Sequence, residues 1–189
     1  MNKKKLLLIG ASTGGPGHIE KILLSLPQNF SACVVIAQHI DKVFLDSMVK
    51  HLKNRTNLQI STAVTNRCLL SSNIVFVHSH LVSITKKDQS LYLKSIESNS
   101  FYNPSIDELF LSVVNLSREY EILACLLTGI GDDGAKGLLA LKKSSVHCIA
   151  ESQKSSIVYG MPKAAYDIGA TDEVLDIDEI VEKIKKFVV

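Results

Sequence analysis

Short apolar runs alternate with amphipathic stretches along most of the chain. The runs at residues 6–9, 33–37 and 122–127 are apolar throughout, which is typical of parallel strands covered on both faces. Residues 147–151 and 173–175 predict two further short strands. Between the strands, apolar positions recur with helical spacing, so strands and helices are expected to alternate.

The first helix is expected between Pro16 and Pro27, because proline suits the first turn of a helix and interrupts one further along. Ser105 is expected to cap a later helix over residues 106–118. This alternation predicts an α/β fold, a doubly wound, mostly parallel sheet flanked by helices, in a single domain over residues 1–189. The other helices are expected at residues 43–53, 135–143 and 177–187, with a short one after Gly160-Met161-Pro162.

The pattern changes between residues 58 and 93. Short β-branched pieces recur there, separated by polar turns. They predict an insertion that contains at least one antiparallel hairpin. The pieces lie at residues 60–64, 74–77, 81–85 and 91–93.

Composition adds few constraints. The chain has 189 residues, 46% hydrophobic and 21% charged, which is ordinary for a globular protein. A net charge of +2 is too small to favour nucleic acid as a partner, and no apolar run is long enough for membrane insertion. The four cysteines have no Cys-x-x-Cys spacing, so free thiols in a reducing cytoplasm are expected; they are Cys33, Cys68, Cys125 and Cys148.

A candidate nucleophile follows the first strand. The segment Gly10-Ala11-Ser12-Thr13-Gly14 fits the Gly-x-Ser-x-Gly spacing, in which small residues let the chain turn sharply and expose the serine. The next helix directs free N–H groups toward negative charge that develops beside Ser12. When this segment is considered by itself, two alternatives remain: phosphate binding, as in Rossmann folds, and a plain turn.

Polar residues also follow two other strong strands. Ser12 follows the first strand, His39 the second, and Asp132 and Asp133 the third. Because open parallel sheets place their sites at the carboxyl ends of strands, these side chains are expected to meet at one edge. They predict a Ser-His-Asp triad, with Ser12 as nucleophile, His39 as general base and one aspartate orienting the imidazole.

A nucleotide cofactor fits the sequence less well. Dinucleotide folds place an acidic residue at the end of the second strand, where this chain has Gln38 and His39. No Gly-Lys-Ser or Gly-Lys-Thr follows the glycines, which excludes a P-loop. No metal site is expected either, because no Cys or carboxylate lies near His78 and His80 in the sequence. His18 and His51 are predicted to be surface residues.

Four segments together resemble the catalytic domain of the chemotaxis protein-glutamate methylesterase family. The resemblance implies a doubly wound α/β domain without metal or cofactor. It also implies hydrolysis of γ-glutamyl methyl esters on cytoplasmic regions of methyl-accepting chemotaxis receptors, with release of methanol, and deamidation of receptor glutamines in the cytoplasm. The segments are Ile9-Gly10-Ala11-Ser12-Thr13-Gly14-Gly15-Pro16, Ala37-Gln38-His39, Leu127-Thr128-Gly129-Ile130-Gly131-Asp132-Asp133-Gly134-Ala135 and Gly160-Met161-Pro162.

The resemblance assigns roles to single residues. The family's serine and histidine fall on Ser12 and His39, and its aspartate falls on Asp133 rather than Asp132. The oxyanion and substrate-positioning residues are expected to be Thr13, Gly14 and Ile130.

The sequence departs from the family pattern in three ways. Members usually carry methionine in place of Ile130, a change of contour that should preserve catalysis. They commonly carry asparagine in place of Asp132, whose extra charge favours a higher pKa of Asp133. Members commonly have an N-terminal receiver domain, and none is expected in cis here because Ser12 lies almost at the start.

Two other functions remain open from the sequence. One is a non-catalytic module on the same fold that binds receptors or nucleotides, suggested by Ile130 and Asp132. The other is a peptidase or lipase, which the same triad chemistry permits.

Overall fold

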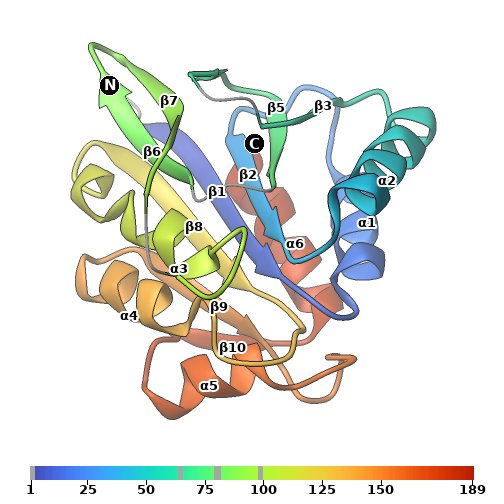
Figure 1. Ribbon diagram of the computed structural model, residues 1–189, viewed down its shortest axis with the longest axis vertical. Helices are drawn as coiled ribbons and strands as arrows, with labels where there is room; N and C mark the ends of the chain where they lie inside the picture. The colour runs from blue at the N-terminus through green and yellow to red at the C-terminus, as the bar shows by residue number, and fades with distance from the viewer. Residues whose placement is uncertain (1–2, 64–65, 79–81, 98–99) are drawn as a thin grey trace.

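A parallel sheet organises the chain. The computed structural model describes residues 3–63, 66–78, 82–97 and 100–189. In these ranges seven strands form one parallel sheet in the order β10-β9-β8-β1-β2-β5-β3, with β1 at its centre (Figure 1). The strands are β1 (Lys4–Ala11), β2 (Cys33–Gln38), β3 (Gln59–Thr62), β5 (Asn73–Val77), β8 (Tyr120–Leu126), β9 (His147–Glu151) and β10 (Glu173–Leu175).

Helices cover both faces of this sheet, which confirms the predicted doubly wound fold. In Figure 1, α3 lies in front of the sheet and α6 behind it. Along β1, Leu6 and Leu8 pack with α3, α4 and α5, whereas Leu7 and Ile9 pack with α1, α2 and α6. Both faces are therefore buried, which explains why the strand is apolar throughout. The helices are α1 (Gly15–Ser25), α2 (Lys42–Arg55), α3 (Ile106–Leu111), α4 (Ala135–Lys143), α5 (Met161–Asp167) and α6 (Ile177–Val188).

The predicted insertion was partly wrong. The antiparallel hairpin is confirmed by β6 (Val82–Lys87) and β7 (Ser90–Ser95), which β4 (Cys68–Leu69) joins in a small sheet. However, β3 and β5 belong to the main parallel sheet, where β5 pairs with β2. β5 is buried from residue 74 onward, as a strand covered on both faces requires. Residues 64 and 81, which the predicted pieces included, lie outside the described residues.

The helix expected over residues 106–118 is shorter than predicted. Its cap is confirmed, because the Ser105 hydroxyl accepts the N–H of Glu108 at 3.2 Å. The α-helix ends at Leu111, and the next residue, Ser112, has a hydroxyl that donates to the Leu109 carbonyl and accepts the N–H of Ile84. The Ser112 side chain thus connects the end of α3 to β6. A 3-10 turn, η1 (Val114–Leu116), follows in place of further α-helix.

The cysteines are free, as predicted. Cys33, Cys125 and Cys148 are buried, and Cys68 is half-buried. Burial raises the pKa of the Cys33 and Cys148 thiols to about 12, so both stay protonated near neutral pH. Within the described ranges, the helices all lack the combination of length and apolar character that a bilayer crossing needs.

Candidate active site

The turn after β1 presents Ser12 at the carboxyl edge of the sheet. The Ser12 N–H donates to the Thr128 carbonyl at 2.9 Å, and the Gly15 N–H donates to the Ser12 carbonyl at 2.9 Å. Gly14 has a φ of 87°, a left-handed conformation that favours glycine, and α1 begins at the next residue. Ser12 is half-buried, and the described residues offer its hydroxyl no hydrogen-bond partner.

Gly129 lets the neighbouring loop approach this turn closely. A Cβ at residue 129 would lie 2.6 Å from the Cβ of Ser12 and 2.4 Å from the sulfur of Met161. Both distances are shorter than Cβ contacts in proteins, so any side chain at residue 129 would force Ser12 or Met161 to shift. The contact also explains the segment Gly160-Met161-Pro162, whose buried methionine supports the loop beneath the serine.

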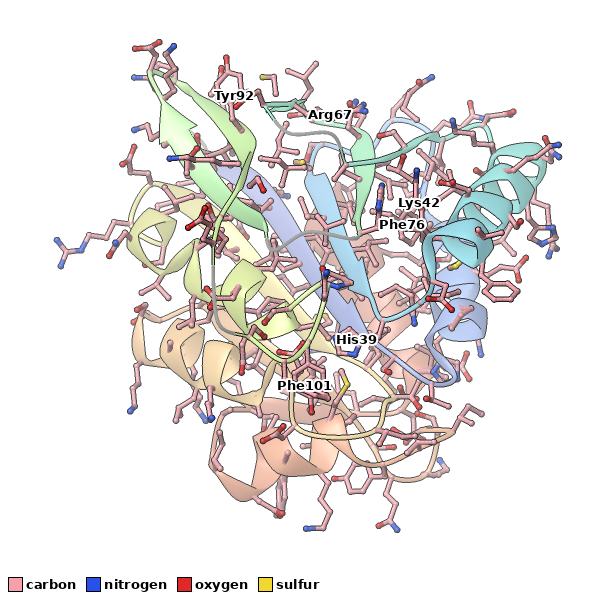
Figure 2. The ribbon with its side chains drawn as sticks, viewed as in Figure 1. His39, Lys42, Arg67, Phe76, Tyr92 and Phe101 are labelled. Carbon is pink, nitrogen blue, oxygen red and sulfur yellow. The ribbon has the colours of Figure 1, made fainter. Side chains whose placement is uncertain are left out.

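His39 reaches the same edge from the end of β2. Ala11 pairs with Gln38 as the last residues of adjacent strands, so Ser12 and His39 each directly follow one of these strands. The His39 N–H donates to the Ala11 carbonyl at 2.9 Å. The buried Gln38 amide nitrogen donates to the carbonyls of Ser12 and His39, at 2.9 and 3.1 Å. These bonds tie the two loops together. Figure 2 shows His39 in the lower half of the view, whereas Tyr92 lies near the top.

Asp133 is buried and faces the imidazole. Its Oδ2 lies 2.8 Å from Nε2 of His39 and accepts the N–H of Ile106 at 2.7 Å. Its Oδ1 accepts the Asp107 N–H at 2.9 Å and the Ser105 hydroxyl at 3.3 Å. Burial pushes the pKa of Asp133 upward, but the bonds from His39 and the two N–H groups hold it below the usual value. The pKa of Asp133 is therefore lowered overall, although the sequence favoured an upward effect of the Asp132 charge.

The other aspartate faces away from this pair. Asp132 is exposed, and its Oδ1 accepts the hydroxyl of Tyr102 at 3.2 Å. The Tyr102 ring stacks on His39 with centroids 5.3 Å apart and 4° between the planes. Burial and the Asp132 carboxylate raise the pKa of Tyr102, which keeps its hydroxyl a donor. No sequence signal pointed to Tyr102, because its contact with His39 depends on the fold of a loop.

Free backbone donors lie in the serine turn and the loop beside it, and several apolar side chains on the surrounding loops are exposed. Among the described residues, the backbone N–H groups of Thr13, Gly14 and Ile130 have no acceptor. The Ile130 side chain is 63% exposed, Ile157 is 67% exposed and lies against Gly14, and Phe101 is 95% exposed beside Tyr102. Figure 2 shows Phe101 and His39 in the same part of the view, below the centre of the molecule.

One prediction for the remaining histidines was wrong. His18 is not a surface residue: its side chain is 14% exposed, and Nδ1 lies 3.2 Å from Oε2 of the buried Glu151. His51 is exposed, as predicted, and pairs with Glu20. Within the described ranges, no group of three or more His, Cys, Asp or Glu side chains could hold a metal ion. His80 lies outside the described residues.

Known proteins share this sequence pattern and this fold. The family model for the CheB methylesterase matches residues 7–184. The chain belongs to the CheB methylesterase family. The crystal structure of the CheB methylesterase catalytic domain of Thermotoga maritima superimposes with a TM-score of 0.91 and 27% sequence identity, over 100% of both chains.

Curated relatives of the CheB methylesterase family carry a double name. A protein-glutamate methylesterase/protein-glutamine glutaminase of Carboxydothermus hydrogenoformans is 37% identical over 97% of this chain and 55% of its own length. One of Pseudomonas fluorescens is 35% identical over 96% of this chain and 54% of its own length. The chain thus spans about half the length of the curated relatives it matches.

Proposed function

We propose that this chain is a serine hydrolase that demethylates γ-glutamyl methyl esters on the cytoplasmic regions of methyl-accepting chemotaxis receptors. The same site would deamidate receptor glutamines. Family membership and the double name of the relatives support this reaction class. The observation that carries the assignment is the His39–Asp133 pair, 2.8 Å apart, directly beside the turn that presents Ser12.

Acylation uses the side chains of Ser12, His39 and Asp133. A carboxylate only accepts hydrogen bonds, so Nε2 of His39 carries the hydrogen that faces Asp133 and Nδ1 is the basic nitrogen. Oγ of Ser12 attacks the ester carbonyl carbon while its proton passes to Nδ1. Free N–H groups at Thr13, Gly14 and Ile130 stabilise the oxyanion. The intermediate expels the methoxy group, which takes the proton from His39 and leaves as methanol.

Deacylation reverses these roles with water. His39 accepts a proton from a water molecule, the resulting hydroxide attacks the acyl-Ser12 carbonyl, and the serine oxygen regains the proton. The products are free enzyme and a glutamic acid side chain, which releases its proton to water and becomes the carboxylate. A glutamine substrate follows the same steps with ammonia as the leaving group. Asp133 keeps its charge throughout and stabilises the imidazolium.

We infer that residues 1–189 form a single catalytic domain that acts in the cytoplasm, where the receptor regions carry their methylated glutamates. The reaction written above balances with water alone, so we expect neither a metal nor a cofactor.

The test is methanol release from membranes that carry methylated receptors. The protein should release methanol, and Ser12→Ala should abolish release while its circular dichroism stays native. Ser25→Ala is the matched control, because that hydroxyl donates to a carbonyl within α1. Full activity of Ser12→Ala would overturn the assignment of the nucleophile. Nucleotide binding without any turnover would favour a binding module instead.

A further inference from the structure

A buried carboxylate lies below the nucleophile turn but outside the proposed triad. Glu151, the last residue of β9, is wholly buried. Its Oε2 accepts the Thr128 N–H at 2.9 Å and lies 3.2 Å from Nδ1 of His18, while Oε1 accepts the Ser155 hydroxyl at 2.7 Å. Burying a carboxylate is costly unless it is partnered. Its partners therefore indicate what this carboxylate holds in place.

The first partner connects the carboxylate to the serine turn. Thr128 is buried, and its carbonyl accepts the Ser12 N–H at 2.9 Å. Its hydroxyl donates to the Thr13 carbonyl at 2.8 Å and accepts the N–H of Val158 at 2.9 Å. A shift of Thr128 would therefore move the nucleophile and the residue after it together.

The second and third partners hold the surroundings of the turn. His18 lies on α1, which begins directly after the turn, so its contact with Glu151 fixes this helix relative to β9. Ser155 belongs to the segment after β9 that carries Ile157 against Gly14. The Glu151 carboxylate thus contacts Thr128, helix α1 and the segment after β9, which all adjoin the nucleophile turn.

We propose that Glu151, together with His18, is a positioning residue for the nucleophile turn. The pair fixes the Ser12 hydroxyl and the N–H groups of Thr13 and Gly14 relative to His39. This role rests on the proposed function of Ser12. Glu151 is buried beneath the turn and does not contact the ester, so its loss lowers kcat through misplaced attack and leaves KM unchanged.

Three variants separate positioning from general stability. Glu151→Leu keeps a similar volume but removes every acceptor. Glu151→Gln keeps an acceptor oxygen for Thr128 and places its amide nitrogen toward the Ser155 hydroxyl. His18→Leu removes only the contact with α1. The matched control is Glu173→Leu, which breaks a second His–Glu pair, the 2.7 Å contact with His147 at the other end of β9.

Two readouts decide the proposal: kcat and KM for p-nitrophenyl acetate, and amide hydrogen exchange of the Ser12 and Gly15 N–H groups. Glu151→Leu should lower kcat about ten- to hundredfold with KM within about twofold, and should speed exchange at both amides. Glu151→Gln should restore both values, and the control should match the wild type. Unchanged kcat and exchange in Glu151→Leu, or no restoration by Glu151→Gln, would overturn the proposal.

The remaining outcomes are also decisive. If Glu151→Leu does not fold, His18→Leu replaces it, with lower kcat and faster exchange expected and wild-type values contradicting the proposal. If the wild type hydrolyses no ester, the proposed function fails. In that case exchange alone decides the positioning role: faster exchange in Glu151→Leu or His18→Leu supports it, and unchanged exchange overturns it.

Discussion

Nε2 of His39 lies 2.8 Å from Oδ2 of Asp133, although 94 positions separate the two residues in the chain. The imidazole thus turns Nε2, rather than Nδ1, toward the carboxylate. In the serine-protease arrangement the opposite nitrogen faces the aspartate. Nδ1 is therefore the atom left to accept the serine proton, and the active tautomer carries its hydrogen on Nε2.

The two adjacent aspartates should differ sharply in catalysis. Asp133→Asn replaces a carboxylate that only accepts hydrogen bonds by an amide whose N–H can face His39 and favour the wrong tautomer, so kcat for methanol release should fall by about 10⁴-fold. Asp132→Asn removes the charge but keeps an oxygen that can accept the Tyr102 hydroxyl, so kcat should stay within about threefold. Equal losses in the two variants would show that the wrong carboxylate has been assigned.

The close approach at Gly129 gives a second prediction. Gly129→Ala should lower kcat about tenfold or more, because the new Cβ displaces Ser12 or Met161. Gly17→Ala is its control, since a Cβ there meets nothing within 4 Å and helix propensity favours alanine by up to about 1 kcal/mol. Thermal unfolding and steady-state kinetics measure both. A fully active Gly129→Ala would contradict the tight contact.

The lowered pKa of Asp133 predicts a pH dependence of stability. A carboxyl whose pKa is lower in the folded state stabilises the fold above its unfolded value and loses that contribution as the pH falls. Asp133→Asn should therefore have a lower free energy of unfolding than the wild type at pH 7. The difference should shrink as the pH falls below the usual carboxyl value of 3.8. Urea titrations from pH 7 to 3 test this, and a difference independent of pH would contradict it.

Tyr102 should act on the histidine through its ring rather than its hydroxyl. Tyr102→Phe keeps the stack on His39 and loses only the bond to Asp132, so kcat should stay within about twofold. Tyr102→Ala loses the stack, which is worth about 0.5 to 1.5 kcal/mol, and kcat should fall about two- to tenfold. Comparable kcat values for the two variants would show that the stacked ring does not position His39.

The main sheet and the placement of Ser12 and His39 followed from the sequence for a physical reason. Continuous apolar runs mark strands buried on both faces, and the polar residue after each run falls at one edge of a parallel sheet. The sequence did not predict that β5 belongs to that sheet, because a short β-branched run is equally compatible with a hairpin strand and with a parallel strand.

The contacts made by side chains were harder to predict. His18 has helical spacing with no feature that points to Glu151, and the two residues are 133 positions apart in the chain. The Tyr102 stack depends on a loop whose course no periodic pattern specifies. Such pairs are created by tertiary packing, and the residue types alone do not indicate them.

The central claim is that Ser12 is the nucleophile and that His39 activates it. Labelling with a fluorophosphonate, followed by peptide mass spectrometry, tests this most directly, because the reagent bonds covalently to an activated serine oxygen. We predict one adduct, on Ser12, whose formation is slowed strongly in His39→Ala and Asp133→Asn but not in Asp132→Asn. No adduct on Ser12, or labelling at the same rate without His39, would contradict the account.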